Sequence, residues 1–112
     1  MAFSGAVVSS VTQGVKQFQG VFGEMWSVAM TMNPPSIAAG AEDSTSVTIQ
    51  GLRLGDMVLG FSTTTDPTID SVVNFWVSGS NTLSIGISNL NGASALDIAS
   101  ATWKILIGRP NW

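Results

Sequence analysis

The stretch SVVNFWVSGSNTLSIGIS, residues 71–88, contains two alternating runs of apolar and polar residues that flank a short Ser/Gly/Asn turn. This pattern is typical of an antiparallel β-hairpin. One face of the hairpin carries the apolar side chains of both strands, namely Val73, Phe75, Val77, Leu83, Ile85 and Ile87. Because directly paired residues share a face, Phe75 can pair with Leu83 and leave a loop of three or five residues. We therefore predict this register, in which Val73 pairs with Ile85.

The same register places Trp76 on the opposite face of the hairpin. Its expected neighbours there are Asn74, Thr82, Ser84 and Gly86. A rigid, amphipathic ring in this position suits a contact between subunits or a platform for a sugar, and burial beneath another loop is a third interpretation. The neighbours offer one amide, two hydroxyls and no charge, whereas sugar sites commonly use carboxylates, amides or Arg. They favour a protein–protein contact within a homotrimer, around its threefold axis.

Outward from the hairpin, residues 28–109 consist of short segments rich in β-branched and aromatic residues, separated by turn-forming clusters. The expected strands are 28–32, 45–50, 56–62, 71–77, 82–88 and 101–107. Such spacing is typical of a sandwich or a small barrel. We therefore predict an all-β domain over residues 28–112, an antiparallel β-sandwich or small, jelly-roll-like barrel. The predicted core includes Val73, Phe75, Val77, Leu83, Ile85, Trp103 and Ile105.

Residues 1–27 have a different pattern. Apolar residues recur there at steps of three and four, which suits a helix, but four glycines lie among β-branched residues and no cap is evident. We interpret this segment as an extended N-terminal docking arm whose apolar side chains are covered by a neighbouring subunit or a larger particle. The candidate interface residues are Phe3, Val7, Val11, Phe18, Phe22, Trp26 and Trp76.

The composition of the 112 residues, enough for one domain, excludes several classes of function. Cysteine and histidine are absent, which removes disulfides, the usual zinc sites and imidazole catalysis. Only four basic residues occur, and they are scattered, so we expect no nucleic-acid binding. No run approaches the ~18 apolar residues of a membrane span. Charged residues make up 10% of the chain, against ~25% in typical domains, which favours an oligomer or a part of an assembly.

The carboxylates offer two alternatives to a purely structural role. Asp66 and Asp70 could contribute to a calcium site, although both also suit turns. Glu42 and Asp43 could serve a glycosidase, but adjacent loop residues rarely flank one glycosidic bond. Serine has no histidine or cysteine to activate it, and no phosphate-binding loop is present. We therefore predict a chain that is not an enzyme and has no metal site and no cofactor.

Three segments together resemble small β-domain proteins of tailed-phage virions, which include capsid decoration (cement) proteins, head fibres and related spikes. These segments are residues 35–60, 72–92 and 95–110. In that group a Ser-Ile-Ala-Ala-Gly loop, a Gly-Asp turn, an Asn-Thr hairpin and a terminal Thr-Trp strand follow one another. The matching residues are Ser36–Gly40, Gly55, Asp56, Val58, Asn81, Thr82, Ile85, Asn89, Ser100, Thr102 and Trp103. The chain departs from the pattern at Leu83 and Ile98.

The resemblance implies a non-enzymatic virion component, namely a decoration protein that binds and stabilises the assembled head. It implies the major capsid protein as partner, a homotrimer, and a location on the outer surface of the capsid. One alternative is a receptor- or glycan-binding β-module of a head or tail fibre, with Trp76 as the stacking platform. A more distant one is a secreted carbohydrate-binding domain.

Overall fold

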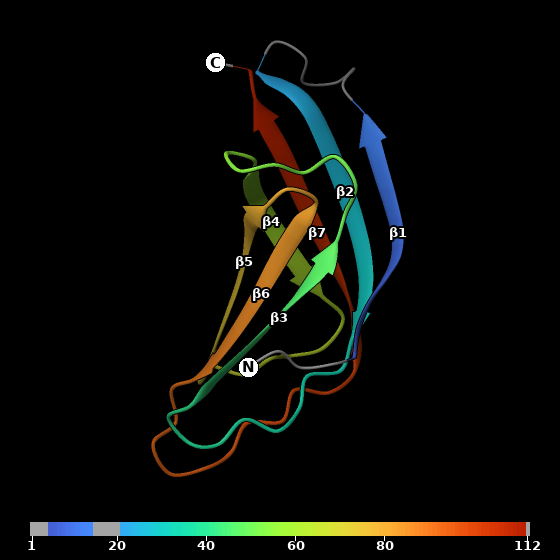
Figure 1. Ribbon diagram of the computed structural model, residues 1–112. Helices are drawn as coiled ribbons and strands as arrows, with labels where there is room; N and C mark the ends of the chain where they lie inside the picture. The colour runs from blue at the N-terminus through green and yellow to red at the C-terminus, as the bar shows by residue number, and fades with distance from the viewer. Residues whose placement is uncertain (1–4, 15–20, 112) are drawn as a thin grey trace.

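The computed structural model describes residues 5–14 and 21–111, and the regular structure in these ranges is entirely β. Its strands form two antiparallel sheets, one in the order β1-β2-β7-β4 and the other in the order β3-β6-β5. The sheets face each other as the two layers of a sandwich (Figure 1). The strands are β1 (Ala6–Gly14), β2 (Phe22–Met32), β3 (Glu42–Thr48), β4 (Met57–Thr63), β5 (Ser71–Gly79), β6 (Thr82–Asn89) and β7 (Ala101–Pro110).

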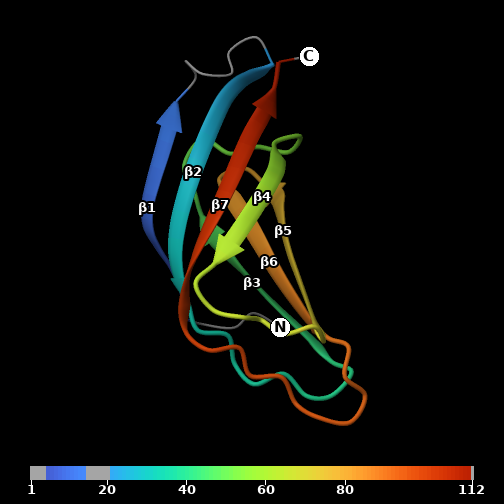
Figure 2. The ribbon, with the colours of Figure 1, turned by 180° about the vertical axis from the view of Figure 1, so that it is seen from behind.

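The strand pairs are nested along the chain. β2 pairs with β7, β3 pairs with β6, and β4 and β5 contact each other across one edge of the sandwich. This is the arrangement of a long hairpin rolled into two layers, as in a jelly roll. The view from behind shows β4 and β7 in one layer and β5 and β6 in the other (Figure 2). The prediction of an all-β domain is confirmed, and of its two alternatives, a sandwich or a small barrel, the structure forms the sandwich.

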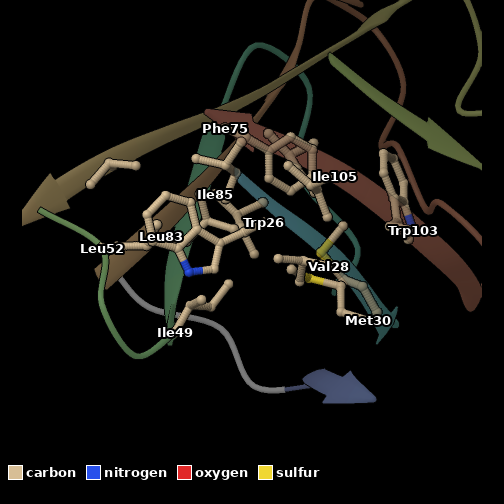
Figure 3. Close-up of a cluster of buried hydrophobic side chains, with 14 of the residues drawn as sticks. Trp26, Val28, Met30, Ile49, Leu52, Phe75, Leu83, Ile85, Trp103 and Ile105 are labelled. Carbon is tan, nitrogen blue, oxygen red and sulfur yellow. The ribbon is translucent and has the colours of Figure 1, made fainter. Parts of the chain in front are cut away.

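The core lies between the two layers and follows from the alternation in each strand. In β2 the side chains of Trp26, Val28, Met30 and Met32 point inward and are fully buried. They meet buried residues of β5, β6, β7 and the connecting loops (Figure 3). Each fully buried apolar side chain contributes roughly 1.5–3 kcal/mol. The predicted core is confirmed, with Val73 partly buried and the others buried, namely Phe75, Val77, Leu83, Ile85, Trp103 and Ile105.

The register of the β5–β6 hairpin differs from the prediction by two residues. Phe75 pairs with Ile85 instead of Leu83, and Val77 pairs with Leu83. A bulge between Val77 and Gly79 then leads into a two-residue turn, in which Asn81 has a φ of 59°. Asn81 can hold this left-handed conformation because its backbone and side chain bond to residues 49–52. A shift of two leaves every side chain on its expected face.

The boundary of the predicted N-terminal arm needs correction. β2 begins at Phe22, inside the predicted arm, and pairs with β7 from there onward. β1 adds to the same sheet through β2 as an edge strand. From Trp26 onward every second side chain of β2 is buried, so the period of two that is typical of a strand already begins before residue 28. The spacing of three and four in residues 1–27 therefore did not indicate a helix. The described parts of residues 1–27 therefore belong to the sandwich.

Candidate functional site

Trp76 lies on the outer face of the β3-β6-β5 sheet, as predicted. It is 41% exposed and sits directly opposite Ser84, not opposite Thr82 as expected from the sequence. Its six-membered ring rests on Gly86, because a Cβ at that glycine would lie 3.2 Å from Cζ3 and 3.4 Å from Cη2. The absence of a side chain at Gly86 therefore lets the ring lie close to the sheet.

A hollow of about 240 Å³ lies beside the Trp76 ring. It is lined by Glu42, Asp43, Ser44, Trp76, Gly86, Ile87 and Ser88. Glu42 is the first residue of β3 and pairs with Ser88 of β6, while Ser44 pairs with Gly86. This acidic edge could not be predicted from the sequence, since nothing in residues 71–88 indicates that residues 42–48 pair beside them.

The whole outer face of the β3-β6-β5 sheet is polar around Trp76. The register assigns to this face Glu42, Ser44, Ser46 and Thr48 of β3, Thr82, Ser84, Gly86 and Ser88 of β6, and Val72, Asn74, Trp76 and Ser78 of β5. Hydroxyl side chains dominate it, and two apolar side chains of any size, Val72 and Trp76, occur within it. The Ser78 and Ser84 hydroxyls bond to each other beside the ring.

The outer face of the β1-β2-β7-β4 sheet is different, because apolar side chains gather on it. Phe22 and Leu59 cover Gly108, where a Cβ would lie 2.7 Å from Phe22 Cδ1 and 3.2 Å from Leu59 Cδ1. Leu59 and Leu106 are exposed and line a shallow hollow of about 320 Å³. Met57, opposite Gly108 on the edge strand, is exposed as well. We call Phe22, Met57, Leu59 and Leu106 the apolar patch.

The candidate interface residues of the predicted arm have different environments. Val7 and Val11 are exposed on the edge strand β1, and Phe22 is half-buried in the apolar patch. Trp26 is fully buried between the sheets, so its assignment to an interface is wrong. It alternates in phase with Val28, Met30 and Met32, which is the signal of a core position. The two other candidates, Phe3 and Phe18, lie outside the described residues.

The carboxylates of residues 66 and 70 serve turns. The Thr68 amide donates to Asp66 Oδ1 at 2.9 Å, and Asn91 Nδ2 donates to Asp70 Oδ2 at 3.2 Å. Nowhere in ranges 5–14 and 21–111 do three or more Asp or Glu residues gather closely enough to hold a metal ion.

Two residues that match the phage-protein pattern support the fold from within. Asp56 is bound by Arg109 and by the Arg53 amide, and it fixes the turn before β4. Asn89 is buried and donates to three backbone carbonyls, those of Ile37, Ala38 and Ser94. It thereby joins the two long loops at one end of the sandwich, which run side by side in both ribbon views (Figures 1 and 2). Both of these matching residues therefore shape turns and loops.

Comparisons with protein-family models, with curated proteins and with solved structures found no match. The two outer faces of the sandwich are therefore the candidate functional surfaces. One face is hydroxyl-rich with a single tryptophan beside the Glu42 carboxylate, and the other carries the apolar patch.

Proposed function

We propose that this protein is a non-enzymatic structural component of a tailed-phage virion, namely a decoration protein that binds the assembled head from outside and stabilises it. Its partner is the major capsid protein, and the protein acts as a homotrimer. The resemblance of residues 35–60, 72–92 and 95–110 supports this proposal. The jelly-roll arrangement also suits it, since such sandwiches build viral capsid domains, although one fold can host many functions.

The observation that carries the proposal is the apolar patch on the outer face of β1-β2-β7-β4. Leu106 is 43% exposed and Leu59 is 38% exposed, and both line one shallow hollow, while the half-buried Phe22 lies with Leu59 over Gly108. Contiguous exposed apolar side chains rimmed by polar groups mark protein–protein contacts. Charged residues make up 10% of the chain, and Lys104 lines the same hollow as Leu59 and Leu106, so a positive charge lies at the rim of the patch.

The patch is also firmly built, which suits a docking surface. Leu59 lies at a bulge in β4 between Val58 and Gly60, and such bulges redirect a side chain at a sheet edge. Phe22 and Leu59 both lie over Gly108 and fill the space that a side chain there would need. Side chains that are packed in this way have less conformational freedom to lose on binding, which lowers the entropic cost of association.

The test uses the full-length chain and heads, assembled without it, of the phage that encodes it. We expect the wild-type protein to sediment with the heads in a saturable manner and to raise their resistance to heat. Leu106→Asp and Leu59→Asp each place a charge in the patch and should reduce binding at least tenfold. Thr48→Asp, on the outer face of the other sheet, is the matched control and should bind as the wild type does.

Two results would refute this proposal. One is a wild-type protein that does not bind the heads at any concentration tested. The other is equal binding by Leu106→Asp, Leu59→Asp and Thr48→Asp, which would show that the patch plays no part. Analytical ultracentrifugation of the wild type tests the homotrimer, and a stable monomer at micromolar concentration would contradict it.

The fibre alternative, a glycan-binding module, is favoured by one specific observation, the acidic hollow beside Trp76. That hollow lies on the opposite layer from the apolar patch. A protein docked through the patch would therefore leave Trp76 accessible.

A further inference from the structure

We infer that the hollow beside Trp76 binds one pyranose ring of a neutral carbohydrate. This inference does not depend on docking to a phage head, because it uses residues of the other sheet. The site consists of an apolar platform, a polar rim and an acidic edge.

The platform is the Trp76 indole. It is 41% exposed, and its Cζ3 and Cη2 atoms occupy the space that a side chain at residue 86 would need. A rigid ring placed over the sheet in this way offers an exposed apolar surface at a low entropic cost. The face of a pyranose that carries axial hydrogens is flat and apolar as well, and the two surfaces are complementary. The hollow of about 240 Å³ is smaller than the ~300–1,000 Å³ of drug-sized sites, which suits a single ring.

The rim supplies hydrogen-bonding groups around this platform. Ser44 and Ser88 line the hollow, and their hydroxyls can both donate and accept. Glu42 is exposed at the same edge, and its ionised carboxylate accepts hydrogen bonds from hydroxyl groups. Among the described residues no side chain bonds to the Glu42 carboxylate or to the Ser88 hydroxyl. These groups can therefore turn toward a bound ligand without first breaking an internal bond.

The charge on this edge selects among carbohydrates. Glu42 lines the hollow from the outer face, which carries neither Lys nor Arg, whereas Asp43 alternates to the other face and accepts a hydrogen bond from the Ser44 amide through Oδ1. A uronic or sialic acid would bring a carboxylate next to Glu42 and would be repelled. Neutral hexoses escape this cost, so the site should distinguish neutral polymers from acidic ones.

A subunit contact is the competing occupant of this face, and the composition of the face argues against it. The buried centre of a protein interface is more apolar than the average surface, about 65% in homodimers, with charged residues depleted. Around Trp76 the register instead places seven hydroxyl side chains and a carboxylate, with Val72 as the one other large apolar group. The apolar patch on the opposite sheet is the better surface for association.

Affinity electrophoresis of the full-length chain tests the inference. The gels contain a neutral glucan, a neutral galactan, a neutral mannan or, as the charged counterpart, polygalacturonic acid. We expect at least one neutral polymer to retard the wild type, and polygalacturonic acid to retard it at least tenfold less. Trp76→Ala should weaken retardation at least tenfold and Glu42→Ala about threefold. Trp76→Phe should retain part of it, and the matched control Leu106→Ala should behave as the wild type.

Four outcomes would overturn the inference. The first is that no neutral polymer retards the wild type, and the second is that Trp76→Ala is retarded as strongly as the wild type. The third is that polygalacturonic acid retards the wild type as strongly as a neutral polymer does. The fourth is a lower sedimentation coefficient for Trp76→Ala than for the wild type, which would identify a subunit contact. Far-UV circular dichroism verifies that each variant is folded. Head binding by Trp76→Ala separates this test from that of the proposed function, since docking through the patch should survive the loss of Trp76.

Discussion

Arg109 at the end of β7 holds Asp56 in a two-pronged ion pair, with Nε 2.8 Å from Oδ1 and Nη2 2.9 Å from Oδ2. The same guanidinium bonds to Glu24 of β2 and, at 2.7 Å, to the Gly51 carbonyl. It also lies 5.1 Å from the centroid of the Trp26 ring. One side chain thus joins β7, β2 and the loop before β4.

Loss of Asp56 should destabilise the fold strongly. Its side chain is 1% exposed, and removal leaves the largely buried Arg109 without its main partner. We expect Asp56→Ala to lower the free energy of unfolding by about 3 kcal/mol or more. Asp97→Ala, at an exposed loop position, is the control and should change it by less than ~0.5 kcal/mol. Urea denaturation measures both, and a loss below ~1 kcal/mol for Asp56→Ala would contradict the assigned role.

The contribution of Arg109 should not vary across neutral and moderately alkaline pH. The hydrogen bond to Asp56, together with the charges of Asp56 and Glu24, raises the pKa of Arg109 above its ordinary value. Because the pKa of Arg109 is higher in the folded state than in the unfolded state, its charge stabilises the folded protein fully at any pH below the unfolded-state pKa. This stabilisation is lost only as the pH rises through the folded-state pKa. Both pKa values of Arg109 lie far above pH 10. The difference in unfolding free energy between wild type and Arg109→Met should therefore be constant from pH 7 to pH 10, and a clear trend would refute this.

Phe75 is the aromatic centre of the core near the β4–β5 edge. Its ring lies 4.9 Å from that of Phe61 and 6.0 Å from that of Trp103, centroid to centroid. Phe75→Ala should cost roughly 3–5 kcal/mol, as is typical for a buried phenylalanine. Phe61→Ala removes the same ring from a position that is 44% exposed and should cost clearly less. Equal losses in chemical denaturation, or a loss below ~1 kcal/mol for Phe75→Ala, would show that the inside–outside assignment is wrong.

Gly108 tests the construction of the apolar patch. A Cβ there would lie 2.7 Å from Phe22 Cδ1, so Gly108→Ala must displace the Phe22 ring. We expect a loss of roughly 1–3 kcal/mol, as for other overpacked sites. The matched variant is Gly60→Ala on the neighbouring strand, where a Cβ meets nothing within 4 Å, and it should be nearly neutral. Thermal unfolding compares the two, and equal midpoints would contradict the close packing over Gly108.

Asn81 tests what sets the register of the β5–β6 hairpin. Its φ of 59° disfavours most side chains, and its Oδ1 accepts a hydrogen bond from the Gly51 amide at 2.8 Å. Asn81→Ala should cost about 1–3 kcal/mol, since it meets the backbone penalty and leaves that amide without its partner. Asn81→Gly also leaves the Gly51 amide without its partner, but glycine adopts this φ without a backbone penalty. This variant should therefore lose less stability than Asn81→Ala. Amide hydrogen exchange measures both variants, and a greater loss for Asn81→Gly would be inconsistent with this account.

The sequence by itself determined the strands of residues 28–109 in outline and the faces of their side chains. Alternation with a period of two is a local property, so residues 71–88 predicted a hairpin with Phe75 inward and Trp76 outward, and both are found. The same property identified the inward residues of β7. In residues 1–27, interspersed glycines and a coincidental spacing of three and four hid the strand that begins at Phe22.

Tertiary structure alone decided what surrounds the candidate sites. Glu42 reaches the Trp76 hollow because β3 pairs with β6, whose residues lie some forty positions further along the chain than those of β3. Arg109 meets Glu24 across a separation of 85 residues, and Phe22 meets Leu59 over Gly108. Even the exact register of the hairpin depends on the loop of residues 49–52, which binds its turn. A local pattern determines which face a side chain takes, but it cannot specify which distant strand lies beside it, because that choice follows from the packing of the whole core.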